Sequence, residues 1–478
     1  MNERILENFL SLTRIPRKSH HEEAVSRFLY EWAQGKGLVS HRDEVGNVII
    51  DRPASAGCEN KPRTILQAHM DMVCVAEQGR KYDPLTDPIQ VINDGVTLTA
   101  DGTSLGGDDG AGVAIAMDIV EDQDAVFGPV RAIFTVDEED GMLGADKLSP
   151  EYLDADYLVN LDWEAFGSLC CSSAGSDMYE LRRNVLWEET GECIAYALDI
   201  QGLEGGHSGA QIHLGMANAI RMAARILSAG AEACGGIRLA VFRGGSAHNA
   251  IPSACFAVAV TQPGKGEAFL EAVRRAVDTE LEGCALTDPG ALITVTETEA
   301  PAAAISSVDS ADILGILCAV HDGVNTWSAS IPGLVESSAN TGLAHLEGDG
   351  FTFMIHQRSS EPALTARMKD VYLAQAAQFG FAMDVLTSSP AWPVRPGSEL
   401  LEICARQFRT LTGNEIRVEP VHAGLECGGF SQKNPALDII SIGPDILDIH
   451  SPKETLVLQS VYDCSRLVRG ILKEIAEK

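Results

Sequence analysis

The sequence predicts an α/β fold, with one discontinuous domain on a mostly parallel sheet and an α+β domain inserted into it. Three observations support this prediction. Predicted strands and helices follow one another in turn along the first part of the chain. Longer strands with alternating apolar and polar residues begin near residue 191, and the strand–helix order returns near 380. The 478 residues suffice for two such domains. The expected boundaries are 1–190 and 381–478 for the two halves of the α/β domain and 191–380 for the insertion.

The first half opens with two amphipathic helices, at 5–13 and 22–35, and Ser19 is expected to cap the second one. Short apolar strands then alternate with helices, which favours parallel pairing in one sheet. These strands and helices are expected at 48–50, 64–68, 110–120, 130–135, 142–148 and 157–161.

The insertion combines strands that alternate between apolar and polar residues with two long helices. The strands are expected at 193–200, 237–243, 254–261 and 292–298, and the helices at 214–229 and 266–280. Beyond it, a helix at 399–411 and a strand at 439–442 return to the α/β pattern.

Charge and composition exclude several classes of function. The chain carries 68 Asp and Glu against 36 Lys and Arg, a net charge of −32, which repels nucleic acids and anionic membranes. No apolar run approaches the ~18 residues of a membrane span, and no signal peptide is recognisable. The 12 cysteines form no C-x-x-C pair, as expected for reduced thiols. We therefore expect a cytoplasmic protein with neither nucleic acid nor membrane as a partner.

Polar residues of similar chemistry follow four of the predicted strands, and one more precedes a predicted helix. The carboxyl ends of parallel strands meet at one edge of a sheet, where open α/β sheets bind ligands. Carboxylates crowded there would repel one another unless a cation lay between them, and imidazoles with carboxylates suit zinc. Each residue alone also fits an ordinary surface turn, so the metal site rests on their conjunction. The residues are His69, Asp71, Asp108, Glu138, Glu139, Asp162 and His450.

The glycine-rich stretch at 102–112 offers an alternative, a phosphate-binding loop. It lacks the Lys-Ser/Thr pair of a nucleotide-binding loop, and its aspartates would oppose phosphate. A phosphate site is therefore the less favoured interpretation.

Several segments resemble those of the aminoacyl-histidine dipeptidases, carnosine-cleaving members of the dinuclear-zinc exopeptidase superfamily. The similarity extends over nearly the whole chain. It is carried by LQAHMDMV at 66–73, GGDDG at 106–110, EEDGM at 138–142 and HSP at 450–452, and further by HEE at 21–23, GGHSG at 205–209, NAIP at 249–252 and HAGLECG at 422–428.

The resemblance implies two zinc ions per chain, which cobalt or manganese could replace, and a zinc-exopeptidase catalytic domain. Asp71 would orient a metal-binding histidine, Glu138 would be the general base, and the peptide bond after Asp108 would be cis. The implied ligands are His69 and Asp162 for one ion, Glu139 and His450 for the other, and Asp108 as the bridge between them.

The resemblance also implies that the inserted domain is a lid over the site. His207 would donate to the tetrahedral oxyanion, and Asn249 and Arg358 would hold the terminal carboxylate of the substrate. The implied reaction is hydrolysis of dipeptides with C-terminal histidine, including β-alanyl-histidine, by a zinc-activated water.

Alternatives remain open at this point. A related hydrolase could act on tripeptides or N-acyl amino acids, and a catalytically silent binding protein could keep the fold, although such a protein would not need Glu138. The sequence departs from the family pattern at Asp109, at 162–165 and at the pair Cys170-Cys171, which bears on substrate preference. The expected partner is a small peptide, and a homodimer is one possible oligomeric state.

Overall fold

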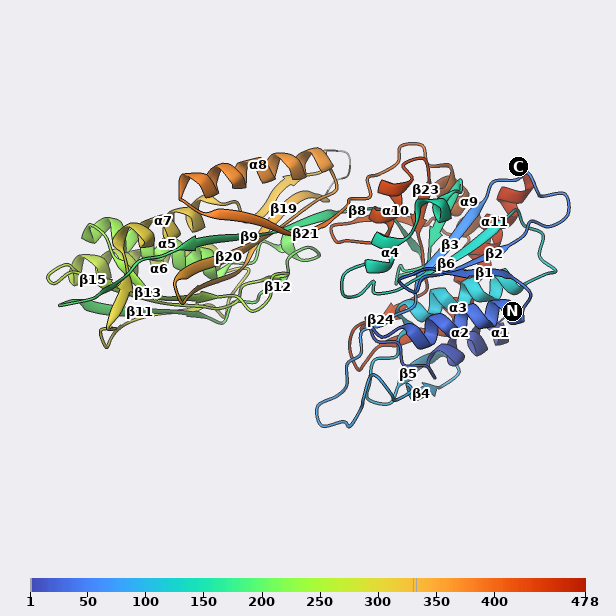
Figure 1. Ribbon diagram of the computed structural model, residues 1–478, viewed down its shortest axis with the longest axis horizontal. Coiled ribbons are helices and arrows are strands. Elements are labelled where there is room, and N and C mark those ends of the chain that lie inside the picture. The colour runs from blue at the N-terminus through green and yellow to red at the C-terminus, as the bar shows by residue number, and fades with distance from the viewer. Residues whose placement is uncertain (1, 330, 332) are drawn as a thin grey trace. The chain divides into compact units, whose positions relative to one another are not determined.

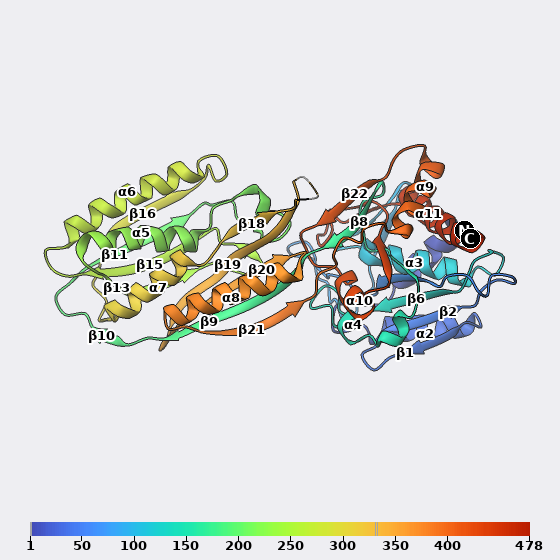
Figure 2. The same cartoon turned by 90° about the horizontal axis from the view of Figure 1, so that it is seen from above.

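The computed structural model describes residues 2–329, 331 and 333–478, and the chain forms two compact units (Figures 1 and 2). The α/β unit contains the described residues up to Ser173, with Trp392–Pro420 and Leu425–Lys478. The inserted unit contains Ala174–Ala391 and Val421–Gly424. The predicted α/β class is confirmed, and the α/β unit is discontinuous in sequence.

The boundaries of the inserted unit differ from the predicted residues 191 and 380. The unit begins at Ala174 and its main segment ends at Ala391. The reason is strand pairing, because β9 (Gly175–Asn184) and β21 (Ala382–Ser389) pair with each other in the sheet of the inserted unit. Both strands lie wholly outside the predicted range of 191–380.

The α/β unit is built on an eight-stranded sheet with the order β1-β2-β6-β3-β7-β23-β8-β22. Its centre is parallel, since β3 pairs in parallel with β6 and β7, and β7 with β23. Within the described residues, β8 lies in this sheet between β23 and β22, which come from the far end of the chain. The strands are β1 (Val39–Arg42), β2 (Val48–Arg52), β3 (Thr64–His69), β6 (Val130–Thr135), β7 (Tyr157–Asn160), β8 (Ser168–Ser173), β22 (Arg417–Val421) and β23 (Asp438–Ser441).

The central strands are apolar because both faces of the sheet are covered. Ile65 and Leu66 are neighbours on β3, so they point to opposite faces, and both are fully buried. The helices of this unit are α1 (Asn2–Leu12), α2 (Glu23–Gly35), α3 (Gly107–Glu121), α4 (Leu143–Lys147), α9 (Glu399–Thr412), α10 (Cys427–Lys433) and α11 (Leu458–Glu477), with a 3-10 turn at Pro150–Leu153.

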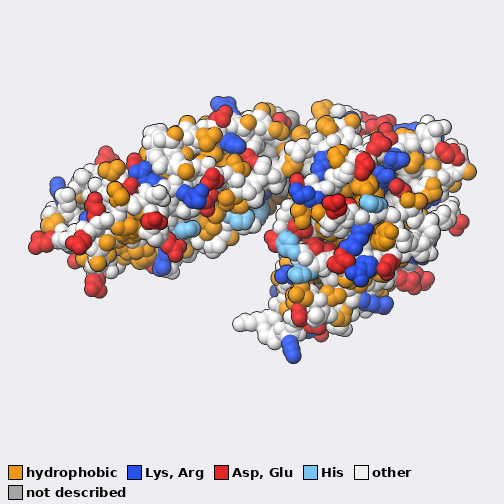
Figure 3. All heavy atoms as spheres, viewed as in Figure 1, with side chains coloured by type: hydrophobic (Ala, Val, Ile, Leu, Met, Phe, Trp, Pro, Cys, Tyr) orange, Lys and Arg blue, Asp and Glu red, His pale blue; other side chains and the backbone are white. Residues whose placement is uncertain are grey.

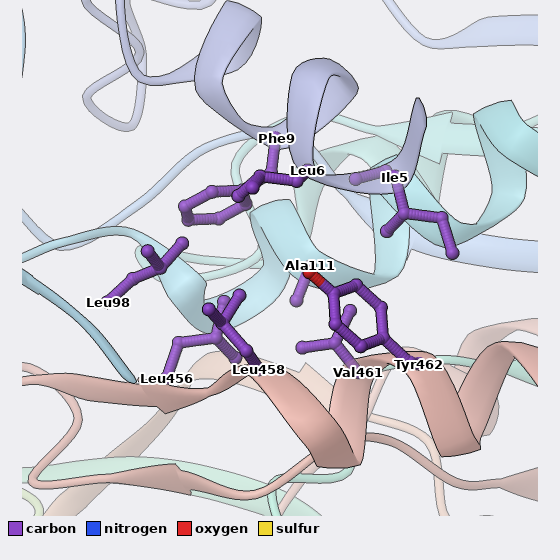
Figure 4. Close-up of a pocket in the computed structure, with 10 residues that line it drawn as sticks. Ile5, Leu6, Phe9, Leu98, Ala111, Leu456, Leu458, Val461 and Tyr462 are labelled. Carbon is purple, nitrogen blue, oxygen red and sulfur yellow. The ribbon is translucent and has the colours of Figure 1, made fainter. Parts of the chain in front are cut away.

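Helices from both ends of the chain pack together in this unit. Figure 4 shows Phe9 on α1, Ala111 on α3 and Val461 on α11 facing one apolar space. Its volume is only about 10 Å³, at the lower limit of what one water molecule needs. The space is therefore a packing defect of the core and offers no room for a ligand.

The prediction that Ser19 caps α2 is wrong. The N-cap residue is Glu22, and no side chain caps the helix by a hydrogen bond. The Ser19 hydroxyl instead donates to Oδ2 of Asp71 at 2.9 Å, because a buried carboxylate accepts a stronger hydrogen bond than the helix end offers.

A small four-stranded sheet of the order β24-β25-β5-β4 combines two strands that precede α3 with two strands from near the end of the chain. The connection between β24 and β25 carries His450, and the connection from β5 leads into Asp108. The pairing of β25 with β5 brings these two connections together. The strands are β4 (Val91–Asn93), β5 (Thr97–Ala100), β24 (Ile446–Leu447) and β25 (Thr455–Val457).

The inserted unit has a nine-stranded sheet with the order β16-β11-β15-β13-β19-β20-β9-β21, and β18 pairs with β19. Its helices lie along one face of the sheet (Figures 1 and 2). Besides β9 and β21, the elements are β11 (Ile194–Gln201), α5 (Ala219–Cys234), β13 (Arg238–Gly244), β15 (Cys255–Thr261), α6 (Gly266–Cys284), β16 (Leu292–Thr298), α7 (Ser307–Ala319), β18 (Gly323–Trp327), β19 (Val335–Glu347), β20 (Gly350–Ser359) and α8 (Pro362–Gln378). The short pairs are β10 (Trp187–Glu189) with β17 (Ala303–Ile305) and β12 (Gly206–His207) with β14 (Ala250–Ile251), and a 3-10 turn spans Ile212–Leu214.

The helix predicted at 214–229 begins later, at Ala219. Asn218 is its N-cap, and the Asn218 side chain accepts hydrogen bonds from the backbone N–H groups of Ile220 and Arg221. Gly215, in the left-handed conformation, ends the preceding 3-10 turn. The first turn of the predicted helix, at 214–217, therefore does not join α5.

None of the twelve cysteines, all of which lie in the described part of the chain, forms a disulfide. None of the helices in the described part of the chain combines the length and apolarity that crossing a bilayer requires. On the face shown in Figure 3, acidic side chains are spread over both units, with Lys and Arg between them.

Candidate metal centre

The carboxyl ends of β3, β6 and β7 lie at one edge of the sheet and carry most of the predicted site residues. His69 is the last residue of β3, Glu138 and Glu139 follow β6, and Asp162 follows β7. β3 pairs in parallel with both β6 and β7, so the carboxyl ends of the three strands are adjacent. Asp108 joins them from the first turn of α3.

The carboxylate of Asp108 lies between two imidazoles. Its Oδ1 is 2.9 Å from Nε2 of His69, and its Oδ2 is 3.1 Å from Nε2 of His450. His69 Nε2 is also 3.3 Å from Oδ1 of Asp162, and His450 Nε2 is 2.9 Å from Oε1 of Glu139. The site therefore consists of two halves that share Asp108.

This donor set fits divalent metal ions. The distances of 2.9 to 3.3 Å between the facing atoms are near the ~3.3 Å that separates two donors on one tetrahedral zinc with bonds of about 2.0 Å. Among the described residues, three groups place potential ligand atoms within 4.8 Å of one another. They are His69 with Asp109 and Asp162, His69 with Glu138 and Glu139, and Asp108 with Glu139 and His450.

Asp109 is buried in the same site, but its carboxylate already has other partners. Its Oδ2 accepts from the backbone N–H of His69 at 3.2 Å, and its Oδ1 from that of Gly112 at 3.0 Å. Both oxygens of Asp108, in contrast, face imidazoles. Asp108 is therefore the better candidate for a bridging ligand. The peptide bond between Asp108 and Asp109 is cis, as the resemblance implied.

The electrostatics of the site call for positive charge. Burial raises the pKa of Glu138 well above its ordinary value, and the nearby carboxylates of Asp162 and Glu139 raise it further. Burial likewise raises the pKa of Asp162. Hydrogen bonds to Asp108 and Glu139 raise the pKa of His450 to about 11. The raised pKa of His450 favours its positively charged form, which shows that the site favours a cation beside these carboxylates.

Asp71 connects His69 to the acidic pair. Its Oδ1 is 3.3 Å from Nδ1 of His69 and accepts from the backbone N–H of Glu138 at 3.1 Å. Its Oδ2 accepts from the backbone N–H of Glu139 at 3.2 Å and from Ser19. One buried carboxylate therefore fixes the ring of His69 and the backbone of both glutamates.

Sequence reasoning missed a second buried carboxylate, Glu426, next to α10. Its Oε2 accepts from Nε2 of Gln67 at 2.6 Å and from the hydroxyl of Thr135 at 2.8 Å. Burial raises the pKa of Glu426 to about 7. Only its place in the family-like segment at 422–428 could have pointed to it, since Gln67 lies 359 residues away in sequence.

The inserted unit places the other three predicted residues around one turn. His207 lies on β12, which pairs with β14 directly after Asn249, and the Ser208 N–H donates to the Asn249 carbonyl at 2.9 Å. A Cβ atom on Gly209 would lie 2.9 Å from Nε of Arg358 and 3.1 Å from Cε1 of His207. Glycine at this position lets Arg358 and His207 approach the same backbone.

The tautomer of His207 follows from its contacts. Its Nδ1 faces the backbone N–H groups of Gly209 at 3.2 Å and Ala210 at 3.0 Å, so it acts as the acceptor. Burial, with the charge of Arg358, lowers the pKa of His207. The ring is therefore neutral near pH 7, and its Nε2 carries the proton that it can donate.

Arg358 is a buried cation without a carboxylate partner. Its side chain is on β20 and is only 7% exposed, and its Nε has no hydrogen-bond partner among the residues that the structure describes. Burial lowers the pKa of Arg358 to about 10. An unpaired guanidinium held in this way favours the binding of an anion.

The sequence matches a known peptidase family. The pattern of the peptidase family M20/M25/M40 matches residues 65–474. The cytosol non-specific dipeptidase of Escherichia coli (strain K12) is 32% identical over 475 residues, which cover 98% of this chain and 97% of that protein.

Solved structures agree in fold. The aminoacylhistidine dipeptidase from Vibrio alginolyticus superposes with a TM-score of 0.90 at 30% identity, covering 98% of this chain and 96% of that chain. A tripeptidase from Staphylococcus aureus covers 100% of this chain and 99% of its own, with a TM-score of 0.56 and 18% identity, which is a likeness of fold alone.

Proposed function

Because the chain belongs to the peptidase family M20/M25/M40, we propose that it is a metal-dependent dipeptidase with two zinc ions per chain. The observation that carries this proposal is the Asp108 carboxylate, each oxygen of which faces a different imidazole. The E. coli and Vibrio relatives are 32% and 30% identical to this chain over 98% of its length. Both are named dipeptidases, which supports the proposed activity.

The proposed ligands follow the two halves of the site. His69 and Asp162 bind one ion, Glu139 and His450 bind the other, and Asp108 bridges them. Zinc held there would act as a Lewis acid on the scissile carbonyl and lower the pKa of a water molecule toward neutrality. Asp71 fixes the Nδ1 proton of His69, so that Nε2 is left as the donor atom for the metal.

Glu138 is the proposed general base. No group in the described part of the chain holds its carboxylate by a hydrogen bond, whereas Oε1 of the adjacent Glu139 faces His450 at 2.9 Å. The free carboxylate can take a proton from the attacking water and return it to the leaving amine. The two glutamates therefore divide into one base and one ligand.

The inserted unit is proposed to act as a lid. Its neutral His207 would donate from Nε2 to the oxyanion, and Arg358 with the exposed Asn249 would hold the terminal carboxylate of the peptide. A carboxylate subsite at a fixed distance from the reacting carbonyl limits the substrate to one residue beyond the cleaved bond. This is the physical reason to propose dipeptides over longer peptides.

The proposed substrates are dipeptides with C-terminal histidine, including β-alanyl-histidine. The E. coli relative is named non-specific, which favours a wider range of dipeptides as the second candidate. Its name also places that relative in the cytosol, and we propose the same compartment here.

A substrate panel tests the proposed function. We expect kcat/KM to be at least ~10-fold higher for dipeptides than for matched tripeptides or N-acyl amino acids, since only dipeptides place both ends correctly. Xaa-His dipeptides, other dipeptides, tripeptides and N-acyl amino acids would be compared on one zinc-loaded sample. A preference for tripeptides or N-acyl amino acids would contradict the dipeptidase proposal. Equal rates for all dipeptides would remove only the histidine preference.

Replacing His207 by alanine should lower kcat by ~10² to 10³, the usual loss for one oxyanion donor, with little change in KM. Steady-state kinetics on the preferred dipeptide would measure both constants. His213, exposed on the neighbouring 3-10 turn, provides the control, and His213→Ala should behave as the wild type. An unchanged kcat in His207→Ala would rule out the oxyanion role.

Replacing Arg358 by lysine should raise KM by about 10- to 100-fold with a smaller effect on kcat, because a charged hydrogen bond contributes ~1.5–3 kcal/mol and lysine lacks the planar fork. The same kinetic assay measures this. Arg243, exposed on β13, is the matched control, and Arg243→Lys should leave KM unchanged. A normal KM in Arg358→Lys would contradict the carboxylate subsite.

A further inference from the structure

Two oppositely charged side chains are buried next to the metal centre, and the proposed mechanism uses neither of them. Arg17, between α1 and α2, is 1% exposed, and Glu454, in the connection between β24 and β25, is 2% exposed. Burial lowers the pKa of Arg17, and the charge of Glu454 acts against this shift. Buried charges are costly unless they are fully bonded, so their contacts indicate what they do.

The carboxylate of Glu454 binds four consecutive backbone N–H groups. Its Oε2 accepts from Leu105 at 2.7 Å and Gly106 at 2.9 Å, and its Oε1 accepts from Gly107 at 2.7 Å and Asp108 at 3.2 Å. The last of these groups belongs to the residue that faces both imidazoles. Glu454 also lies four residues after His450 in the same connection.

The guanidinium of Arg17 binds three backbone carbonyls. Its Nη1 donates to Met70 at 3.0 Å and to Asp71 at 2.8 Å, and its Nη2 donates to Gly106. The first two carbonyls directly follow His69. Arg17 therefore joins the end of β3 to the loop that precedes Asp108.

The two side chains also account for the glycines around Asp108. A Cβ atom on Gly107 would lie 3.2 Å from Oε1 of Glu454, and one on Gly110 would lie 2.7 Å from Nη2 of Arg17. The four N–H groups that a phosphate would need are already bonded to Glu454. The glycine-rich stretch is therefore shaped to receive this charged pair, and the phosphate alternative is not supported.

We propose that Glu454 and Arg17 are positioning residues that set the metal affinity of the centre. Glu454 fixes the backbone of Asp108 to the connection that carries His450. Arg17 fixes the loop before Asp108, at Gly106, to the end of β3 that carries His69. The three segments that supply these ligands are thereby held at one spacing. This inference rests on the metal centre of the proposed function.

The test compares zinc affinity between variants of the full chain. Glu454→Gln keeps the size of the side chain, but its amide offers one acceptor oxygen for four N–H groups, so the backbone of Asp108 should shift. We expect zinc to bind about 10- to 100-fold more weakly, the usual cost of losing a group that orients a ligand. Glu454→Asp, which keeps the charge but is one methylene shorter, and Arg17→Lys should fall between this variant and the wild type.

Asp438→Asn is the matched control for lost stability. Asp438 is a 4% exposed carboxylate in the same unit, and it accepts from the Ser398 hydroxyl at 2.7 Å and the Leu400 N–H at 3.1 Å. Its loss should lower the melting temperature and leave the zinc affinity unchanged. Competition with a chromophoric chelator gives the dissociation constants, and circular dichroism confirms that each variant is folded.

Wild-type zinc affinity in Glu454→Gln would overturn the proposal. If that variant does not fold, wild-type affinity in Glu454→Asp overturns it instead. Equal weakening in Asp438→Asn would also overturn it, because the effect would then be one of stability. A wild-type protein that binds zinc but cleaves no dipeptide would contradict the proposed function and leave this comparison intact.

Discussion

Replacing Glu138 by glutamine is expected to lower kcat by ~10² to 10⁴ while both zinc ions remain bound. The glutamine has almost the same shape but cannot accept the proton of the attacking water. Since no described residue forms a hydrogen bond to the Glu138 carboxylate, the change should not disturb the fold. Steady-state kinetics and elemental analysis of the same sample would measure turnover and zinc content together.

The adjacent glutamate provides the contrast. Glu139→Gln should lose about one zinc equivalent, because Oε1 of Glu139 faces His450 as a proposed ligand. Near-normal turnover in Glu138→Gln, or full zinc content in Glu139→Gln, would show that the roles of the two glutamates are assigned wrongly.

Replacing Asp108 by alanine should remove both zinc ions, so that zinc content falls from about two equivalents to well below one. The reason is that the Asp108 carboxylate faces His69 with one oxygen and His450 with the other. Turnover should fall by more than the ~10² to 10⁴ expected for losing proton transfer alone. Zinc analysis after dialysis, followed by a dipeptide assay, would test this.

Two further variants test whether the loss of both zinc ions is specific to Asp108 as the bridging ligand. His450→Ala should lose one equivalent and keep the other. Asp109→Asn should keep both, since Asp109 accepts from backbone N–H groups and its amide retains one acceptor oxygen. If Asp108→Ala retained one tightly bound zinc, Asp108 would belong to a single ion and not to both.

The residues at the strand ends could be predicted from sequence because a parallel sheet brings them together by a general rule. His69 is the last residue of β3, and Glu138 and Asp162 lie shortly after the ends of β6 and β7. The observed parallel pairing puts those strand ends side by side. His450 was expected after the strand at 439–442, and the structure places it further on, between β24 and β25.

Residues that act through long-range contacts could not be predicted. Glu454 lies 346 residues from Asp108 in sequence, and Arg17 lies 89 residues from Gly106. In sequence, both look like the solvated charges around them, Lys18 and Lys453. The pairing of β9 with β21 is equally non-local, which is why the boundaries of the inserted unit were placed too far inward.

The order of strands in the eight-stranded sheet has a consequence for synthesis on the ribosome. β8 is made before the inserted unit, yet the two strands that flank it in the sheet, β22 and β23, are made after the main segment of that unit. At ~5–20 residues per second, translation of the inserted unit takes on the order of 10 to 40 s. During that time β7 is paired with β3 on one side only, and β8 lacks both of the strands that flank it in the finished sheet, which makes the two strands sites for misassembly. Release of the C-terminal segment closes the sheet, so the nascent enzyme becomes resistant to aggregation only in the last steps of its synthesis.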